Sequence, residues 1–401
     1  MNDRNKIAII NSVCGYGSTG RICVELAEFL NSKNLDAMVF YGRNKIKSQR
    51  INAYYFGNKL GVYFHAFLAR LFDSVGLHSK LSTKKLIKKL EEYNPDLIIL
   101  NNLHGYYLNY KNLLRWIAKR NKKTICVFHD CWNFTGHCAH FDYLKCYKWI
   151  SGCQNCPGKK EYPSSIVCDK SKRNYLLKKE LFTNIQKIRI VVPSNWLKTL
   201  AKKSFFNNFK ITVINNGVDT KVFLPNRNNN FRKKYQLENK NIILCVANVF
   251  NKRKGLFDVI NLSKKLDSTE VIVIVGRLNP MIELPNNVIH ISHTESANEL
   301  SEIYSSCDVM FNPTYEDTFS NTNMEALSCG LPVVCYKTGG ATEMLDKRFT
   351  VEQGDFDSAC QLIRRIYRKE VDYNLTDLNF SKDKMHKAYL ILINDFLNKQ
   401  P

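Results

Sequence analysis

Residues 312–345 read NPTYEDTFSNTNMEALSCGLPVVCYKTGGATEML, with short apolar runs between polar turns. A strand is expected first, then a loop with Glu316 and Asp317, then a helix that carries Glu325 and ends at Gly330. Helix N-termini offer unpaired amides and a positive dipole end, which bind phosphate or orient polar ligands. Carboxylates in the loop can accept hydrogen bonds from hydroxyl groups. The stretch therefore predicts a strand–loop–helix–strand unit with a polar ligand site.

This stretch contains one, and the end of another, of eleven apolar runs that alternate with helix-like segments along the chain. Such valine- and isoleucine-rich runs suit parallel strands covered on both faces. Eleven strands are too many for one doubly wound sheet of ordinary size, so an α/β fold with two Rossmann-like domains is predicted. The expected strands are 7–10, 36–42, 95–103, 124–130, 188–194, 211–217, 241–248, 270–276, 288–293, 308–313 and 332–340.

The domain boundaries follow from composition. A polar, asparagine-rich segment that contains Pro225 predicts a linker, and the final segment has the pattern of an amphipathic helix. The expected parts are an N-terminal domain (1–220), a linker (221–240), a C-terminal domain (241–380) and a terminal helix (381–401).

A glycine-rich loop, NSVCGYGSTGRICVEL (11–26), follows the first expected strand. Its G-x-G-x-x-G pattern is typical of dinucleotide binding. Gly15 is expected to shape the turn, Gly17 to allow close approach of a ligand, and Gly20 to start the helix. An NADP-dependent oxidoreductase is one interpretation, but the second strand ends with Arg43 nearby instead of the usual ribose-binding acid.

The charge is one-sided. Residues 1–220 carry 36 basic and 14 acidic side chains, whereas residues 221–401 carry 23 basic and 22 acidic side chains. This predicts an anionic partner for the first half, either nucleic acid or anionic lipid. A nucleic-acid-binding protein is disfavoured because no binding motif or aromatic signature accompanies the basic residues.

Two helix-like segments in the basic half allow two interpretations. Segment 59–77 is rich in Phe and Leu, and segment 80–96 is basic. They are either ordinary domain helices, one more buried than the other, or a surface that dips apolar side chains into anionic lipid. No apolar run approaches the ~18 residues of a membrane-spanning helix, and the N-terminus lacks a signal-peptide layout. A cytoplasmic protein is expected.

The opening stretch resembles the donor-site signature of the retaining glycosyltransferases of family 4, which have the GT-B fold. That signature has two acidic residues eight positions apart. The second acid is followed by Ala, a small residue, Gly, Pro and Val-Val, as in MEALSCGLPVV of this chain. The resemblance implies that Glu325 binds the nucleotide ribose. Asp317 stands where the family has Glu, and Glu316 is one residue out of register, so donor-sugar contact is carried to Asp317.

More of the family pattern appears in order along the chain. Lys254 matches the lysine that neutralises the donor diphosphate, while Val249 replaces the usual Arg and Arg253 is expected to reach the same phosphates. Fixed cations stabilise a leaving diphosphate without a metal. The matching segments are VVPSNWLKTL (191–200), VINNGVDTKVF (213–223) and NKRKGLFDVI (251–260).

His129 ends the expected strand in TICVFHDCW. A lone histidine there is more often structural, but in the resembled family it faces the donor sugar, which it positions and stabilises. The resemblance also implies a front-face, oxocarbenium-like route in which the leaving phosphate takes the acceptor's proton. It implies two domains facing across a cleft, with Gly15 and Gly17 closing over the donor.

A cysteine-rich insert (about 131–160) follows His129 and resembles an insert of the colanic-acid type of exopolysaccharide enzymes. Its C-x-x-C pair is a common zinc hairpin, but the wider spacing of its first pair is not standard. A structural zinc and unliganded packed thiols both remain open, and no metal site is assigned. The four cysteines are Cys138, Cys146, Cys153 and Cys156.

The resemblance thus implies a metal-independent, retaining hexosyltransferase that needs no cofactor and uses a UDP- or GDP-sugar. The expected acceptor is a polyprenyl-diphosphate-linked glycan for bacterial exopolysaccharide, capsule or lipopolysaccharide O-antigen. Such an enzyme is expected at the inner face of the plasma membrane, held peripherally through its basic half, without nucleic acid.

Overall fold

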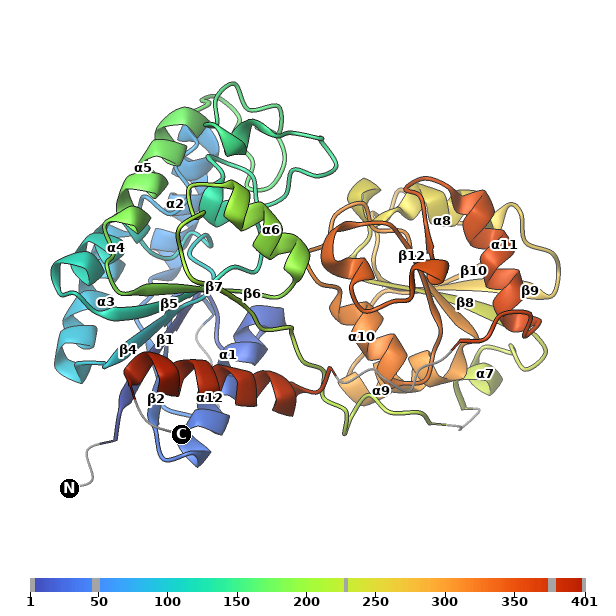
Figure 1. Ribbon diagram of the computed structural model, residues 1–401. Coiled ribbons are helices and arrows are strands. Elements are labelled where there is room, and N and C mark those ends of the chain that lie inside the picture. The colour runs from blue at the N-terminus through green and yellow to red at the C-terminus, as the bar shows by residue number, and fades with distance from the viewer. Residues whose placement is uncertain (1–3, 45–50, 227–229, 374–379, 399–401) are drawn as a thin grey trace. The chain divides into compact units, whose positions relative to one another are not determined.

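The computed structural model describes residues 4–44, 51–226, 230–373 and 380–398 (Figure 1). The chain divides into two compact units. The first unit comprises Met1–Ile214 and His386–Pro401, and the second comprises Asn215–Met385.

The first unit has a seven-stranded parallel sheet in the order β3-β2-β1-β4-β5-β6-β7. Its central strands are buried on both faces, which is why they appear in the sequence as continuous apolar runs. The strands are β1 (Lys6–Asn11), β2 (Asp36–Tyr41), β3 (Ala53–Tyr55), β4 (Leu97–Leu100), β5 (Lys123–Val127), β6 (Ile188–Val192) and β7 (Ile211–Val213).

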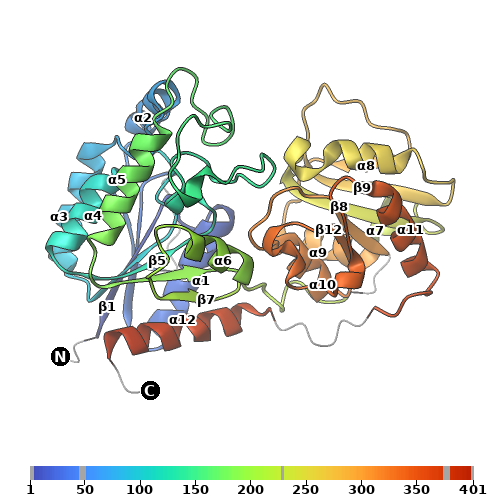
Figure 2. The same cartoon turned by 45° about the horizontal axis from the view of Figure 1, so that its top comes forward.

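Helices cover both faces of this sheet. α3, α4 and α5 lie side by side over one face, and α1 and α12 lie over the other (Figures 1 and 2). On α12, His386 stacks on Phe29 of α1 at 5.2 Å between ring centroids. The helices are α1 (Gly17–Ser32), α2 (Lys59–Phe72), α3 (Lys80–Tyr93), α4 (Tyr110–Lys119), α5 (Ser171–Thr183), α6 (Asn195–Lys203) and α12 (Lys382–Leu397).

The second unit has a six-stranded parallel sheet in the order β10-β9-β8-β11-β12-β13. Its strands are β8 (Asn241–Val249), β9 (Glu270–Arg277), β10 (Val288–Ile291), β11 (Val309–Asn312), β12 (Val333–Tyr336) and β13 (Thr350–Val351). Its helices are α7 (Asn230–Lys234), α8 (Leu256–Ser263), α9 (Ala297–Ser306), α10 (Asn321–Ser328) and α11 (Phe356–Tyr367).

The predicted α/β fold with two Rossmann-like domains is confirmed, and each of the eleven expected strands overlaps an observed one. The strands β3 and β13, which are three and two residues long, were not predicted. Such short edge strands carry too few residues to show a pattern.

The expected linker, 221–240, belongs to the second unit. It contains α7, and its Phe223 and Phe231 are buried in that unit's core. The two units divide between Ile214 and Asn215, a few residues before the expected boundary at 220. A few aromatic side chains thus anchor an otherwise polar segment.

Candidate functional site

Each sheet has one point at which the strand order reverses direction. In the first unit it lies between β1 and β4, and in the second between β8 and β11. Loops that leave the carboxyl ends of two such strands diverge, and ligands of open α/β sheets bind in the space between them. The glycine-rich loop follows β1, and the segments with Lys254 and Asp317 follow β8 and β11.

The loop after β8 is fixed against the loop after β11. Asn251 caps the short helix Lys252–Lys254 by accepting from the Lys254 amide at 3.1 Å. Gly255 has φ +71°, and a Cβ there would stand 2.2 Å from the Pro313 carbonyl oxygen. A side chain at 255 would force the two loops apart, so their close approach requires glycine.

Charged side chains of the two loops pair with one another. Lys254 Nζ lies 3.1 Å from Asp317 Oδ2, and Arg253 Nε lies 3.8 Å from Glu316 Oε2. The Tyr315 amide also donates to the Arg253 carbonyl at 2.9 Å. Glu316 is buried, whereas Asp317 is partly exposed. Two cation–carboxylate pairs therefore stand side by side at the switch point of the second sheet.

Helix α10 begins directly after this loop. Ser320 caps it, accepting from the Asn323 amide at 3.3 Å, and the buried Asn312 at the end of β11 donates to both residues. Further along α10, Glu325 Oε2 accepts from Tyr304 Oη at 3.1 Å. The sequence analysis missed Tyr304 because α9 carries no motif that marks it.

The position that lacks the family's arginine is Val249, which is exposed at the end of β8. Its register partner on β9 is Arg277, whose Nη2 lies 3.2 Å from Asn248 Oδ1. A guanidinium from the neighbouring strand therefore stands beside this position. Sequence reasoning missed it because strand pairing, and not sequence distance, brings it there.

In the first unit, Gly15 and Gly17 have φ values of +67° and +64°, which L-residues with a side chain rarely adopt. A Cβ on Gly17 would meet nothing within 4 Å, so the space beside it is open. The prediction that Gly20 starts the helix is wrong, because α1 begins at Gly17. Gly20 instead lets the first turn pack on the loop, since a Cβ would stand 3.0 Å from Val13.

His129 lies at the same edge of the first sheet. Its Nε2 is 3.0 Å from Asn101 Oδ1, just after β4, and the Asn102 amide donates to Asn11 at 3.4 Å. Burial lowers the pKa of His129 to about 4, so the ring is neutral near pH 7. A neutral imidazole can donate one hydrogen bond and accept another without adding charge.

A second histidine was missed. His104 Nε2 lies 2.8 Å from Asp130 Oδ2, and Asp130 also accepts from the Trp132 amide at 2.9 Å. Burial alone raises the pKa of Asp130, but the charge of His104 and its hydrogen bond outweigh this and lower it. The pair fixes the chain directly after His129. The only sequence signal was that His104 follows a buried strand.

The structure thus brings Arg253, Lys254 and Asp317 together within the second unit, with Glu325 on the following helix. Gly15, Gly17 and His129 share one edge of the sheet in the first unit. No helix in the described ranges has both the length and the apolar character to cross a membrane.

Comparisons with known proteins match both units to glycosyltransferases. Residues 19–222 match the Glycosyltransferase Family 4 description, and residues 227–380 match Glycosyl transferases group 1. The chain is 25% identical over 267 residues to the putative colanic acid biosynthesis glycosyl transferase WcaC of Escherichia coli, over 63% of this chain and 62% of WcaC. It is 24% identical over 181 residues to the capsular polysaccharide biosynthesis glycosyltransferase CapM of Staphylococcus aureus, over 40% and 47%. The alignments therefore span less than two thirds of either relative.

Solved structures resemble the whole chain in fold. Sucrose-phosphate synthase from Thermosynechococcus elongatus matches with a TM-score of 0.69 and 14% identity, over 98% of this chain and all of that one. Anabaena HepE in complex with UDP-glucose matches with a TM-score of 0.66 and 15% identity, over 97% and 99%. These likenesses support the GT-B fold class.

Proposed function

The chain belongs to glycosyltransferase family 4, and from this premise we propose that it is a retaining hexosyltransferase that uses a nucleotide-sugar donor. Lys254 neutralises the donor diphosphate, Asp317 contacts the sugar hydroxyls, and Glu325 binds the ribose. Gly15 and Gly17 approach the donor from the first unit, and His129 positions the reacting sugar.

One observation carries this proposal: Lys254 Nζ and Asp317 Oδ2, 63 residues apart in sequence, lie 3.1 Å apart at the switch point of the second sheet. A lysine for a diphosphate and a carboxylate for a neighbouring hydroxyl must stand close together, because a nucleotide-sugar presents both groups a few bonds apart. Without donor the two side chains neutralise each other. With donor, each exchanges its partner for a ligand group.

The chemistry proposed is metal-independent. The bond between the anomeric carbon and the diphosphate breaks, and the diphosphate leaves with growing negative charge. Lys254, aided by Arg253 or Arg277, stabilises that charge, as fixed cations do in a water-poor site. The leaving phosphate accepts the acceptor's proton, and the acceptor oxygen attacks from the same face, so configuration is retained without a carboxylate nucleophile.

The acceptor proposed is a polyprenyl-diphosphate-linked glycan of bacterial surface polysaccharide synthesis. The likeness to WcaC and CapM, one named for colanic acid and the other for capsular polysaccharide, supports this class. Anabaena HepE, whose solved complex contains UDP-glucose, supports a nucleotide-sugar donor. The family assignment leaves the NADP-oxidoreductase and nucleic-acid interpretations without a supporting observation.

The donor is tested by thermal shift and by transfer. UDP or GDP, and one of the corresponding sugars, should raise the melting temperature, and that sugar should be transferred to a lipid-linked acceptor in a panel assay. NADPH serves as the control ligand. Stabilisation by NADPH with none by either nucleotide would contradict the proposal.

The first unit presents an apolar face for a membrane. Leu60, Tyr63, Phe64 and Phe67 on α2 are 78%, 66%, 62% and 57% exposed, at the i, i+3, i+4, i+7 spacing of one helix face. The exposed segment 166–167 is tied to this helix, since the Ile166 amide donates to the Arg70 carbonyl at 2.6 Å. With the net positive charge of residues 1–220, this face suits anionic lipid at the inner membrane surface.

Vesicle sedimentation tests this face. Binding should require anionic lipid and weaken as salt is raised. The double variant Phe64→Ser/Phe67→Ser should bind several-fold less, by loss of buried apolar area. Ile391→Ser, which removes an exposed apolar side chain from α12, is the matched control and should bind normally. Equal binding of both variants would contradict insertion through α2.

A further inference from the structure

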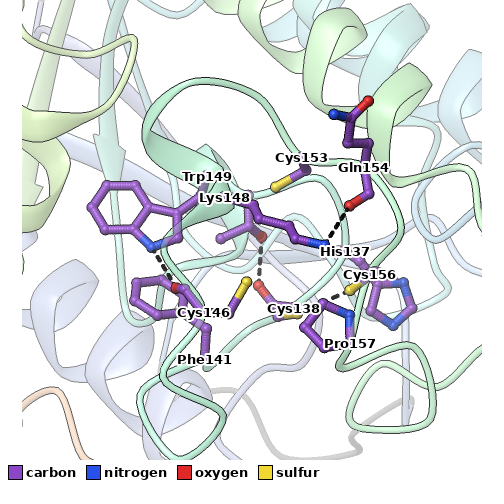
Figure 3. Close-up of a pocket in the computed structure, with 11 residues that line it drawn as sticks. His137, Cys138, Phe141, Cys146, Lys148, Trp149, Cys153, Gln154, Cys156 and Pro157 are labelled. Atoms are coloured by element: carbon purple, nitrogen blue, oxygen red, sulfur yellow. Dashed lines mark hydrogen bonds between the residues drawn. The ribbon is translucent and has the colours of Figure 1, made fainter.

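Four cysteines of the long loop between β5 and α5 line one small cavity of about 10 Å³ (Figure 3). The sulfur atoms of Cys138 and Cys156 lie 3.6 Å apart, and all four are free thiols. Two sulfurs that share a tetrahedral zinc lie roughly 3.8 Å apart, as follows from Zn–S bonds of about 2.3 Å. The 138–156 pair already has nearly this spacing. The four are Cys138, Cys146, Cys153 and Cys156.

The backbone beside the sulfurs donates to one of them. The Gly136 amide donates to Cys153 Sγ at 3.2 Å. A Cβ at Gly136 would stand 2.1 Å from a backbone oxygen, and one at Gly158 would stand 3.1 Å from Cys138 Sγ. Amide donors to sulfur favour the thiolate, the form in which cysteine binds metals.

A buried lysine lies beside the cavity. Lys178 of α5 is 1% exposed, and its Nζ donates to the carbonyls of Trp132 and Thr135 at 2.5 and 2.9 Å. Thr135 lines the same cavity as the thiols. Burial lowers the pKa of Lys178 to about 7, and a zinc tetrathiolate, which carries two negative charges, would favour its charged form.

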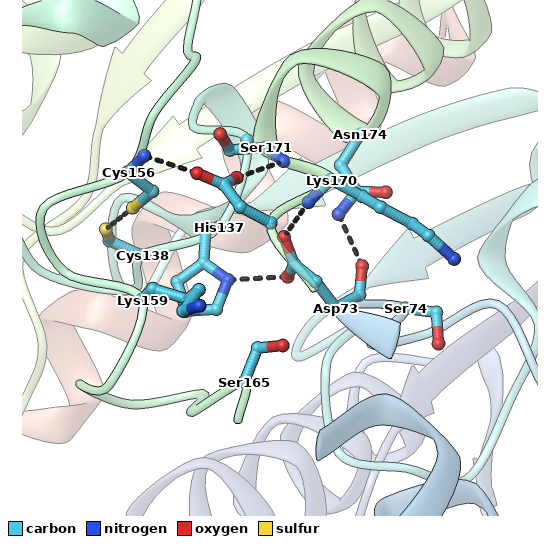
Figure 4. A network of polar contacts seen from close by, with 12 residues as sticks. Asp73, Ser74, His137, Cys138, Cys156, Lys159, Ser165, Lys170, Ser171 and Asn174 are labelled. Atoms are coloured by element: carbon cyan, nitrogen blue, oxygen red, sulfur yellow. Dashed lines mark hydrogen bonds and ion pairs between the residues drawn. The ribbon is translucent and has the colours of Figure 1, made fainter. Parts of the chain in front are cut away.

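His137 gives an independent sign of a missing partner. It is buried, and its Nδ1 lies 2.6 Å from Asp73 Oδ1, while Asp73 also accepts from the Lys170 amide (Figure 4). Its other nitrogen, Nε2, is buried without a hydrogen-bond partner in the described residues. His137 lines the thiol cavity together with Cys156. A metal-bound thiolate would accept a hydrogen bond from this nitrogen, while Asp73 holds the ring in place.

We propose that Cys138, Cys146, Cys153 and Cys156 bind a structural Zn²⁺ that closes the loop between β5 and α5. Binding converts four thiols and Zn²⁺ into a tetrathiolate with charge −2 and releases four protons. No three metal-binding groups in the described residues already stand in ligand geometry. The metal therefore draws Cys146 and Cys153 towards the closer 138–156 pair. His137 is a positioning residue that faces the cluster.

Metal content tests the site directly. The full chain, purified without chelator, should contain about one equivalent of zinc, and Cys153→Ser or Cys156→Ser should retain less than about 0.2 equivalents. Cys168→Ser is the matched control, because Cys168 lies outside the cavity, and it should keep its zinc. Less than about 0.2 equivalents in the wild type, or a 138–156 disulfide in its place, would overturn the proposal.

Cobalt substitution of the wild-type protein provides a second test, which does not depend on a cysteine variant that folds. Wild-type protein stripped of metal and given Co²⁺ should show intense tetrahedral absorption and thiolate-to-metal charge transfer. His137→Gln should keep the four-thiolate spectrum. A weak octahedral spectrum in the wild type, or a changed ligand set in His137→Gln, would overturn the four-cysteine assignment.

Discussion

Two loops that leave carboxyl ends of parallel strands are fixed in opposite ways. The loop after β11, residues 313–320, is short and takes its shape from its neighbour through Gly255, the Tyr315 amide and the Ser320 cap. The loop after β5, residues 128–170, is long and irregular and packs its aromatic side chains into the core of the first unit, where Phe141 stacks on Trp149 at 5.0 Å. The short loop is shaped by contacts with flanking elements, whereas the long loop depends on packing of its own side chains and, as proposed, on a bound metal.

The largest expected effect comes from truncating a buried aromatic side chain of the long loop. Phe134 is fully buried, and its ring centroid lies 5.3 Å from that of Trp149. Phe134→Ala should lower the free energy of unfolding by about 3–5 kcal/mol, as buried Phe→Ala changes do. Urea denaturation measures this, with exposed Tyr147→Ala in the same loop as the near-neutral control. Equal losses in both variants would refute this packing.

The next effect concerns the short loops, whose role is chemical. Lys254→Ala should reduce kcat about 10²–10³-fold, equivalent to about 3–4 kcal/mol, because a fixed cation is lost from the leaving diphosphate. Its melting temperature should stay near that of the wild type, since its partner Asp317 is partly exposed. Lys265→Ala removes a surface ion pair with Asp357 in the same unit and should transfer sugar normally. Transfer by Lys254→Ala at the wild-type rate would exclude it from the donor site.

Substitutions at Gly255 and Gly17 compare a crowded loop with an open one. Gly255→Ala should lose about 2–4 kcal/mol of stability, because strain at positive φ adds to a clash with Pro313. Gly17→Ala shares the positive φ but meets nothing within 4 Å, so it should lose only about 1 kcal/mol. Donor affinity should fall more in Gly17→Ala than in Gly255→Ala, because the proposed donor approaches Gly17. Calorimetric melting and a donor titration measure the two effects, and equal stability losses would refute the crowding argument.

The smallest effect is a pH dependence of the first unit. The folded-state pKa of His129 is about 4, below its unfolded value of about 6.5. As pH falls, the unfolded chain takes up the proton first, so this contribution to stability is full above pH 6.5 and is lost towards pH 4. It amounts to about 1 kcal/mol between pH 7 and about pH 5.5. Urea midpoints of wild type and His129→Gln should differ in slope with pH, and parallel curves would contradict the assigned pKa.

The sequence was enough to predict the two sheets and most of the strands, because buried parallel strands leave continuous apolar runs. The resemblance to a donor-site signature also predicted donor contacts for Asp317 and Glu325, and the separate segment 251–260 predicted one for Lys254. Prediction from sequence failed where a few contacts outweigh local composition. The segment 221–240 is polar overall, yet Phe223 and Phe231 anchor it in the second unit.

Sequence alone determined the fold class, the glycosyltransferase family and the residues of the donor signature, since each depends on patterns within a few dozen residues. Only the tertiary structure decided that Lys254 meets Asp317, that Arg277 stands beside Val249, and that one face of α2 is left exposed. It also gathered four cysteines and a buried histidine around one cavity. The physical reason is that strand order and loop packing join distant residues, and burial depends on which elements pack against a face.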